Sequence, residues 1–268
     1  MEILGEEFIR YAMIAGAVIG GLCAFLGVYV ILKRIVFLGI TLAEVSAMGV
    51  AAGLFLGVNP VGAALVLTIG AVILFWIPYR SRSVSKEGII GFSYVFAAAL
   101  AVILIAKNPM AESKGLDLVS GNLLYVETQD LATVGILALC IIALHSVLYR
   151  NFVFISFDEE TARASGLPAS FYNFLLYLSI GLTVGVTMKV AGILFVFGSL
   201  VVPPLAGLML FQRIPMIFLT SVVFGIITAI IGILVSITLD WPTAPSILVT
   251  SCCGFILIAA VKALLHRR

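Results

Sequence analysis

The sequence predicts an all-α fold, a polytopic membrane bundle of about nine transmembrane helices, with eight or ten as the alternatives. Of the 268 residues, 63% are hydrophobic and 10% are charged, and the mean hydropathy is +1.26. Soluble domains carry about 25% charged residues. The hydrophobic residues also form successive runs of about 20, the length that crosses a bilayer as a helix. We therefore expect residues 1–268 to form a single membrane domain.

The apolar runs place the spans in order along the chain. We predict helices across residues 9–32, 35–57, 60–78, 88–106, 130–149, 171–187, 190–211, 214–239 and 245–265. One boundary stays open, because Met188 and Lys189 either form a turn between two spans or lie within a broken helix. Gly181 and Gly185, just before this point, are compatible with both arrangements.

The positions of Lys and Arg predict how these spans cross the membrane. Of the 15 such residues, 11 fall on one side in this arrangement: Lys33, Arg34, Arg80, Arg82, Lys86, Arg150, Arg163, Arg213, Lys262, Arg267 and Arg268. That side is cytoplasmic by the positive-inside rule. The N-terminus is then outside and the C-terminus inside, which requires an odd number of spans and supports nine. Trp76 and Trp241 fall at span ends, as interfacial aromatic residues do.

Other features narrow the class of protein. No basic cluster with interleaved aromatic residues suggests nucleic acid as a partner, whereas membrane lipids must surround the spans. The acidic N-terminus lacks the basic segment of a cleaved signal peptide, so we expect the first span to remain. The cysteines lie inside apolar runs without metal-ligand spacing and imply no disulfide framework. They are Cys23, Cys140, Cys252 and Cys253.

Small residues recur at four-residue spacing in three spans, a pattern that lets membrane helices approach closely. The rows are Gly16 and Gly20; Gly49, Gly53 and Gly57; and Gly181 and Gly185. We interpret them as packing positions.

Glu44 is the first functional candidate, because it is a single carboxylate in the middle of an apolar run. A lone acid at a helix centre costs about 2.5–3.5 kcal/mol on insertion scales, so it should face protein or water. Ile40, Glu44 and Met48 share one helix face, with Thr41 adjacent. Glu44 could bind a cation, carry a proton or form a structural hydrogen bond. A proton relay usually needs several titratable groups, and no second one lies in mid-membrane.

The inner loop at residues 150–170 predicts a short helix that ends itself. Acidic residues begin it, Ser156 with Glu159 fits a capping box, Gly166 fits the position just after the helix, and Pro168 prevents continuation. The bundle has no evident packing need for this helix, so we interpret it as a contact for a cytoplasmic partner. The alternative is a helix lying on the membrane, although such helices tend to be basic and this one is acidic.

Two further sets of residues give weaker signals. The outer loop at residues 107–130 is long enough for an external entrance or docking surface, or is a plain connector. His145 and His266 have no partners at ligand spacing, and we expect them to be interfacial polar residues. The sequence contains no GxxxxGK[ST] phosphate loop, so a partner or an ion gradient must energise any active transport.

Several segments together resemble the membrane permeases of ATP-binding-cassette (ABC) importers for zinc, manganese and iron. They are LGVYVILKRIVFLGITLAEVSAMG, VSGNLLYVETQDL, FDEETARASGLP, MKVAGILFVFGSLVVPPLAG and residues 240–245. The resemblance covers most of the chain and implies one permease domain over residues 1–268, in a prokaryotic inner membrane. It also implies a homodimer, cytoplasmic ATPase subunits and an external metal-binding protein. FDEETARASGLP resembles the helix that couples to the ATPase, which assigns that role to Asp158, Glu159, Glu160, Ala162, Arg163 and Gly166.

The second span departs from the family pattern. Family members carry an Asp and a His four residues apart along the metal path, in a stretch like G-D-A-L-S-H-A-V-L-P-G. Alignment on Gly39 and Gly49 places Ile40 and Glu44 there, with Met48 in place of the proline. Two Glu44 carboxylates could then approach across the dimer axis as the metal ligands, and oxygen ligands favour manganese or iron(II) over zinc.

The expected function is therefore inward passage of a divalent metal ion through a subunit that is not itself an enzyme and holds no resident cofactor. Two alternatives stay open. The chain could be an ABC permease for a metal chelate or another small solute, or a secondary transporter that uses Glu44 as a proton or sodium site.

Overall fold

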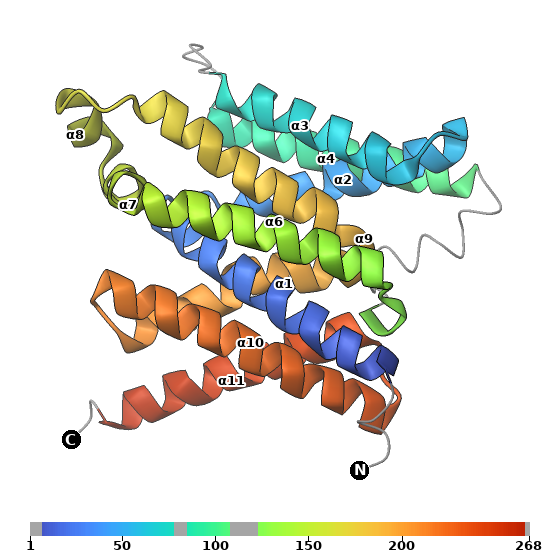
Figure 1. The fold of residues 1–268 in the computed structure, drawn as a ribbon. Coiled ribbons are helices and arrows are strands. Elements are labelled where there is room, and N and C mark those ends of the chain that lie inside the picture. The colour runs from blue at the N-terminus through green and yellow to red at the C-terminus, as the bar shows by residue number, and fades with distance from the viewer. Residues whose placement is uncertain (1–6, 78–84, 108–122, 266–268) are drawn as a thin grey trace.

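The computed structural model describes residues 7–77, 85–107 and 123–265, and within them all regular structure is helical. The helices are α1 (Glu7–Leu32), α2 (Val36–Leu56), α3 (Pro60–Trp76), α4 (Lys86–Ala106), the short 3-10 helix η2 (Leu123–Tyr125), α6 (Thr128–Val147), α7 (Tyr149–Phe157), α8 (Glu159–Ala164), α9 (Ala169–Leu210), α10 (Ile214–Leu239) and α11 (Thr243–Leu265). Seven of these described helices are long and apolar enough to cross a membrane, and the shorter α3 is apolar too. The all-α prediction is confirmed (Figure 1).

Helix α9 contains two spans that reverse direction without a loop. Its 42 residues would extend about 63 Å, twice the hydrocarbon thickness of a bilayer. Gly192 interrupts the helix with φ 76° and ψ 162°, angles open almost only to glycine. In Figure 1 the first half runs from α8 across the bundle and the second half returns to the same end. With α3 and both halves of α9 counted, the described residues form nine spans, as predicted.

The structure also settles the boundary that the sequence left open. Met188 and Lys189 both remain in the helix, and the reversal comes at Gly192. Lys189 Nζ pairs with the Asp130 carboxylate at 3.1 Å, which joins the first half of α9 to the start of α6. The end of the bundle that holds this ion pair is called the outer end below, and the end that carries α7 and α8 is called the α8 end.

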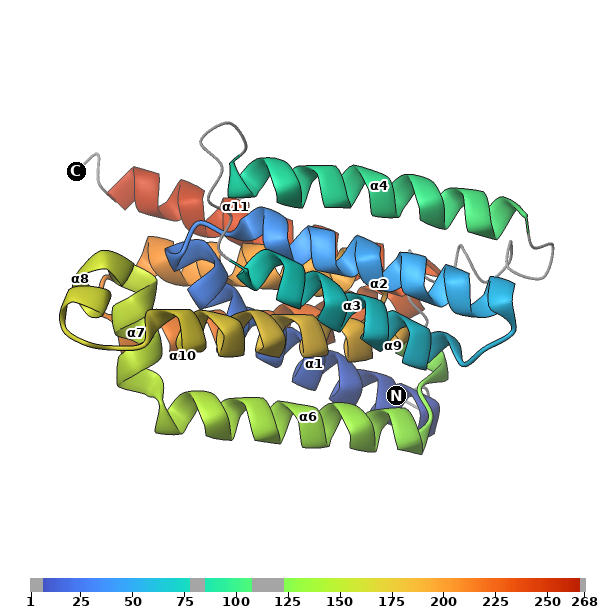
Figure 2. The same cartoon turned by 90° about the horizontal axis from the view of Figure 1, so that it is seen from above.

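Helix α1 lies at the centre of the bundle, packed against α9 and α10. Its side chains Leu22, Leu26 and Tyr29 are almost completely buried. Helix α2 packs against α3, α4 and α9, while α4 and α6 lie on opposite sides of the bundle and expose most of their surface (Figure 2). The core is therefore built around α1 and α9, and the peripheral helices present apolar side chains outward.

Glycines in three spans mark close helix contacts, as predicted. Gly20 of α1 packs on the Gly225 backbone of α10, and Gly49 packs on the Ala64 backbone of α3. Gly181 and Gly185 pack on side chains of α3 as well. Gly57 is different, because nothing lies within 4 Å of its Cβ position and its φ of 70° ends α2 in a left-handed cap. It is a helix stop and no packing position.

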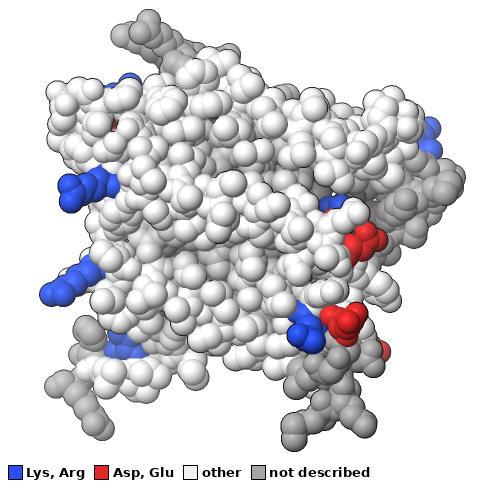
Figure 3. Space-filling model, viewed as in Figure 1, with Lys and Arg blue, Asp and Glu red and all other residues white. Residues whose placement is uncertain are grey.

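Apart from Glu44 in the middle of α2, the charged residues that the structure describes lie toward the two ends of the bundle. The face in Figure 3 shows a central band with no Lys, Arg, Asp or Glu, and charged atoms toward the two ends. The basic residues that the sequence places together do meet at the α8 end where the structure describes them. They are Lys33, Arg34, Lys86, Arg150, Arg163, Arg213 and Lys262. This distribution of basic residues is typical of a multi-pass membrane protein.

Candidate functional site

Glu44 lies on the one stripe of α2 that its neighbours leave accessible. Phe37 is 71% exposed on this stripe, and Ile40, Glu44 and Met48 are half-buried. The predicted shared face of Ile40, Glu44 and Met48 is confirmed. Thr41 differs from the expectation, because it is fully buried and its hydroxyl donates to the Ile90 carbonyl of α4 at 3.3 Å. One side of the helix is therefore fixed to α4, and the carboxylate faces another way.

The Glu44 carboxylate has no hydrogen bond or ion pair within the described residues. The same ranges contain no group of three His, Cys, Asp or Glu side chains that could hold a metal ion within one chain. A carboxylate inside a membrane helix is stable only against protein, a cation or water. A metal ion bound at Glu44 would therefore need its other ligands from outside the described part of this chain.

The segment at residues 158–166, called the coupling segment below after the role that the resemblance predicts for it, is a short helix with an N-cap. The Asp158 carboxylate accepts hydrogen bonds from the Thr161 amide at 2.9 Å and the Thr161 hydroxyl at 2.5 Å. These bonds lower the pKa of Asp158. The predicted capping box is wrong, because the Ser156 hydroxyl donates to the Phe152 carbonyl within α7. Asp158 caps α8 instead, since a break between α7 and α8 leaves Ser156 in the preceding helix.

The C-terminal end of the coupling segment is a Schellman motif. Gly166 has φ 85°, its amide donates to the Arg163 carbonyl at 3.0 Å, and the Leu167 amide donates to the Ala162 carbonyl at 3.1 Å. Gly166 therefore holds the position that the sequence predicted, and Pro168 follows as the N-cap of α9. Helices of six residues are unstable by themselves, and the caps at both ends of α8 stabilise it.

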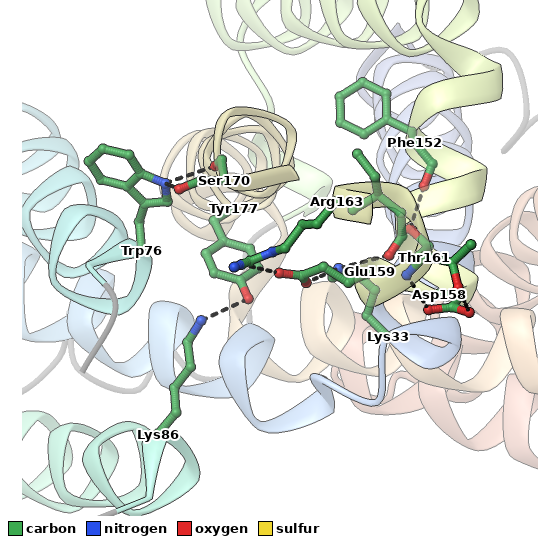
Figure 4. Close-up of polar contacts among 12 residues, drawn as sticks. Lys33, Trp76, Lys86, Phe152, Asp158, Glu159, Thr161, Arg163, Ser170 and Tyr177 are labelled. Carbon is green, nitrogen blue, oxygen red and sulfur yellow. Dashed lines mark hydrogen bonds and ion pairs between the residues drawn. The ribbon is translucent and has the colours of Figure 1, made fainter. Parts of the chain in front are cut away.

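An ion pair fastens the coupling segment to the corner between α1 and α2 (Figure 4). Lys33 Nζ lies 3.2 Å from the Glu159 carboxylate and donates to the Ile155 carbonyl at 3.3 Å, with its side chain only 7% exposed. Arg163 binds the other carboxylate oxygen at 2.6 Å. Burial alone would raise the pKa of Glu159, but the Asn173 hydrogen bond and the Lys33 charge outweigh it and lower the pKa. Glu159 is therefore held ionised between two cations.

The coupling segment packs on the bundle through Ala162, so the prediction that the bundle has no packing need for it is wrong. The Ala162 side chain is fully buried in a small cluster with Ile155 and Ala169. One face of α8 is thus docked on α7 and α9, and the sequence missed this because a six-residue helix shows no clear periodicity. Glu160, Thr161, Arg163 and Gly166 form the exposed face.

A groove of about 720 Å³ lies beside the coupling segment. It runs between α7 and the start of α10 and is lined by Arg150, Phe154, Phe157, Arg213 and Pro215, among others. Phe157 is 56% exposed there. The groove gives the α8 end a surface of arginine and aromatic side chains, two residue classes that are enriched in protein interfaces.

His145 lies in the core of the bundle. His145 is completely buried, stacks on Phe152 and lies 3.1 Å from the Ser179 hydroxyl, so its predicted interfacial position is wrong. The aromatic residues around it come from other helices, which the local sequence could not indicate. His266 lies outside the described residues, as does most of the outer loop at residues 107–130.

Comparison with known proteins gives consistent results over nearly the whole chain. The model of the ABC 3 transport family matches residues 5–262. The manganese transport system membrane protein MntC of Halalkalibacterium halodurans is 28% identical, over 93% of this chain and 86% of the relative. The high-affinity zinc uptake system membrane protein ZnuB of Haemophilus influenzae is 26% identical, over 94% and 96%. Among solved structures, PsaBC from Streptococcus pneumoniae in complex with Fab has a TM-score of 0.84 at 23% identity, covering 94% of this chain and 91% of that one.

Proposed function

Because this chain belongs to the ABC 3 transport family, it is a membrane permease subunit and not itself an enzyme, and we propose that it imports a divalent metal ion. Relatives named for manganese, zinc and iron transport support a metal as the cargo. ATP hydrolysis would come from separate subunits, since the sequence has no phosphate loop. Membership of an ABC family gives no support to the alternative of a secondary transporter.

The observation that carries the metal proposal is the unpartnered Glu44 carboxylate on the accessible stripe of α2. The other half-buried residues of the stripe, Ile40 and Met48, are apolar, so Glu44 is the single strong cation ligand along it. Thr41, which we had grouped with them, would position α2 through its bond to α4 and would not touch the metal. A cation in transit compensates the carboxylate charge, which lipid cannot do at this depth.

A second copy of the chain would supply the missing half of the metal site. We infer a homodimer in which the accessible stripe of α2 faces the partner and two Glu44 carboxylates approach one another. Two carboxylates give hard oxygen donors, which favour manganese or iron(II) over zinc. We also propose that residues 1–268 form one permease domain.

The coupling segment would receive the ATPase. In this assignment Glu160 and Arg163 contact the ATPase directly, while Ala162 and Gly166 keep the shape of α8 and Asp158 caps it. Glu159 would connect the segment to Lys33. The α8 end is then cytoplasmic, the N-terminus is outside and the C-terminus is cytoplasmic, in agreement with the positive-inside rule. An external metal-binding protein would deliver cargo at the outer end.

The test is metal uptake by cells that express this chain with its ATPase and binding protein. We expect Glu44→Gln to reduce manganese or iron uptake to background, because glutamine keeps the shape and removes the charge. The matched control is Glu87→Gln, which removes an exposed carboxylate at the start of α4. Normal uptake by a well-expressed Glu44→Gln variant would exclude the metal-ligand role and favour a chelated or uncharged cargo.

A further inference from the structure

A polar pocket of about 480 Å³ lies at the α8 end, beside the coupling segment. It is enclosed by the end of α3, the start of α4, α8 and the first turns of α9, and its polar wall includes Trp76, Lys86, Arg163, Asn173 and Tyr177. In Figure 4 the Lys86 side chain reaches the Tyr177 hydroxyl, and the Arg163 side chain, from another helix, reaches the Glu159 carboxylate. Lys86 Nζ lies 3.1 Å from the Tyr177 hydroxyl and 4.8 Å from the centre of the ring.

The charges around this pocket do not balance. Lys86 and Arg163 line it together with one carboxylate, Glu159. That carboxylate also neutralises Lys33 from behind at 3.2 Å. Among the described residues that form this network, three cations therefore share one anion. The excess charge is positive, which favours an anionic occupant.

Asn173 adds an unsatisfied acceptor to the same pocket. The residue is 9% exposed, it lines the pocket, and its carbonyl oxygen has no hydrogen-bond partner among the residues that the structure describes. Buried side-chain polar atoms are nearly always hydrogen-bonded in folded proteins. The occupant should therefore carry a donor, such as a hydroxyl group, as well as a negative charge.

Exposed apolar side chains lie within two residues, along the chain, of two residues that line the pocket. Leu74, Ile77 and Phe171 are 52%, 49% and 53% exposed, and they flank Trp76 and Ser170 in the chain. The Trp76 indole donates to the Ser170 carbonyl at 2.8 Å, which holds an aromatic residue at the span end where interfacial tryptophans lie. A ligand with a polar anionic group and an apolar body matches this surface.

We propose that this pocket binds the headgroup of an anionic glycerophospholipid from the surrounding membrane. The phosphate lies between Lys86 and Arg163, and a headgroup hydroxyl donates to Asn173. The acyl chains run along Leu74, Ile77 and Phe171. Basic pockets between membrane helices bind such headgroups in this way. The bound lipid would contact α8 through Arg163. This proposal does not depend on which metal is transported.

The experiment is native mass spectrometry of the purified full-length permease with added phosphatidylglycerol or phosphatidylcholine. We expect the wild-type protein to bind one phosphatidylglycerol per chain in preference to phosphatidylcholine. The Lys86→Gln/Arg163→Gln variant should bind phosphatidylglycerol about thirty-fold more weakly, since each basic residue near an anionic lipid contributes about a factor of five. The Arg150→Gln/Arg213→Gln variant removes two charges from the neighbouring groove and should bind as the wild type does. An unchanged melting temperature verifies that each variant is folded.

Three outcomes would overturn the proposal. The first is equal binding of the two lipids, or equal retention of phosphatidylglycerol by both double variants. The second is displacement of phosphatidylglycerol by millimolar inorganic phosphate, which would identify a free-phosphate site. The third is absence of lipid from the wild-type permease together with loss of ATPase binding in a Lys86→Gln single variant, which would assign the pocket to an acidic group of the ATPase.

Discussion

Removing the Glu159 carboxylate should damage the protein more than removing the Lys33 charge that it binds. The Lys33 side chain is 7% exposed and the Glu159 side chain is 32% exposed. Glu159→Gln leaves a nearly buried ammonium group with the Ile155 carbonyl as its remaining partner. Lys33→Met removes that charge and keeps a long apolar side chain, while Glu159 still has Arg163. The two halves of one ion pair are therefore not equivalent.

The magnitudes follow from these exposures. Breaking a fully buried pair costs about 3–5 kcal/mol, and exposed pairs contribute about 0–1 kcal/mol. Because Glu159 is about one-third exposed, we expect about 2 kcal/mol for Glu159→Gln and about 1 kcal/mol or less for Lys33→Met. In a chain of this size, about 2 kcal/mol corresponds to a fall of roughly 4–8 °C in melting temperature. The double variant should recover part of the loss, since no buried charge remains.

The assay has two readouts in lipid nanodiscs that hold the complete transporter. Thermal unfolding gives the stability of the two single variants and the double variant as a double-mutant cycle. The ratio of ATP hydrolysed to metal transported should rise in Glu159→Gln, because α8 is no longer tied to the corner that begins α2. A larger loss for Lys33→Met than for Glu159→Gln, or strictly additive losses, would refute the reasoning. An unchanged ratio would limit the pair to a structural role.

Further predictions concern the ends of the bundle and the reversal in α9. The fold lowers the pKa of Glu159 below its ordinary value of 4.5. The pair with Lys33 therefore stabilises the folded protein at pH values above 4.5, and this stabilisation is lost as the pH falls through the lowered pKa. The melting temperatures of Glu159→Gln and the wild type should converge only in that acidic range. Gly192→Ala should destabilise by about 1–3 kcal/mol, since alanine is strained at φ 76°, and an unchanged melting temperature would contradict the reversal. Cysteine labelling of intact cells should modify Gln129→Cys and leave Ser165→Cys protected, whereas the opposite pattern would invert the topology. Glu160→Lys on the exposed face of α8 should reduce ATPase co-purification at least about ten-fold with little change in melting temperature, and normal recovery of the complex would exclude this face as the contact.

The sequence was sufficient for the fold because membrane spans are encoded locally. Each run of apolar residues predicts its own helix, and the glycine rows identify faces that pack closely. Gly166 and Pro168 predicted the end of α8 for the same reason, since caps depend on neighbouring residues. The shared face of Ile40, Glu44 and Met48 followed from the helical repeat alone.

Long-range partners could not be predicted from local patterns. Lys33 and Glu159 are 126 residues apart, and nothing near either residue indicates the other. The same holds for His145, whose buried environment comes from α1, α7 and α9. Thr41 does not face the same way as Ile40 and Glu44, because α4 covers its side of α2. The caps, spans and stripes are properties of single helices, whereas these contacts exist only once the helices have assembled.

The loopless reversal at Gly192 has a consequence for how the chain enters the membrane during synthesis. Lys189 is the single charged residue within five positions of Gly192, so the two halves of α9 share no hydrophilic loop that a translocation machinery could pass across and hold on the far side. They must enter together as a hairpin, with the orientation of the first half dictating that of the second. Charges engineered at this turn would therefore have little power to flip either half alone. Any reporter domain inserted there would have to be accommodated inside the folded protein.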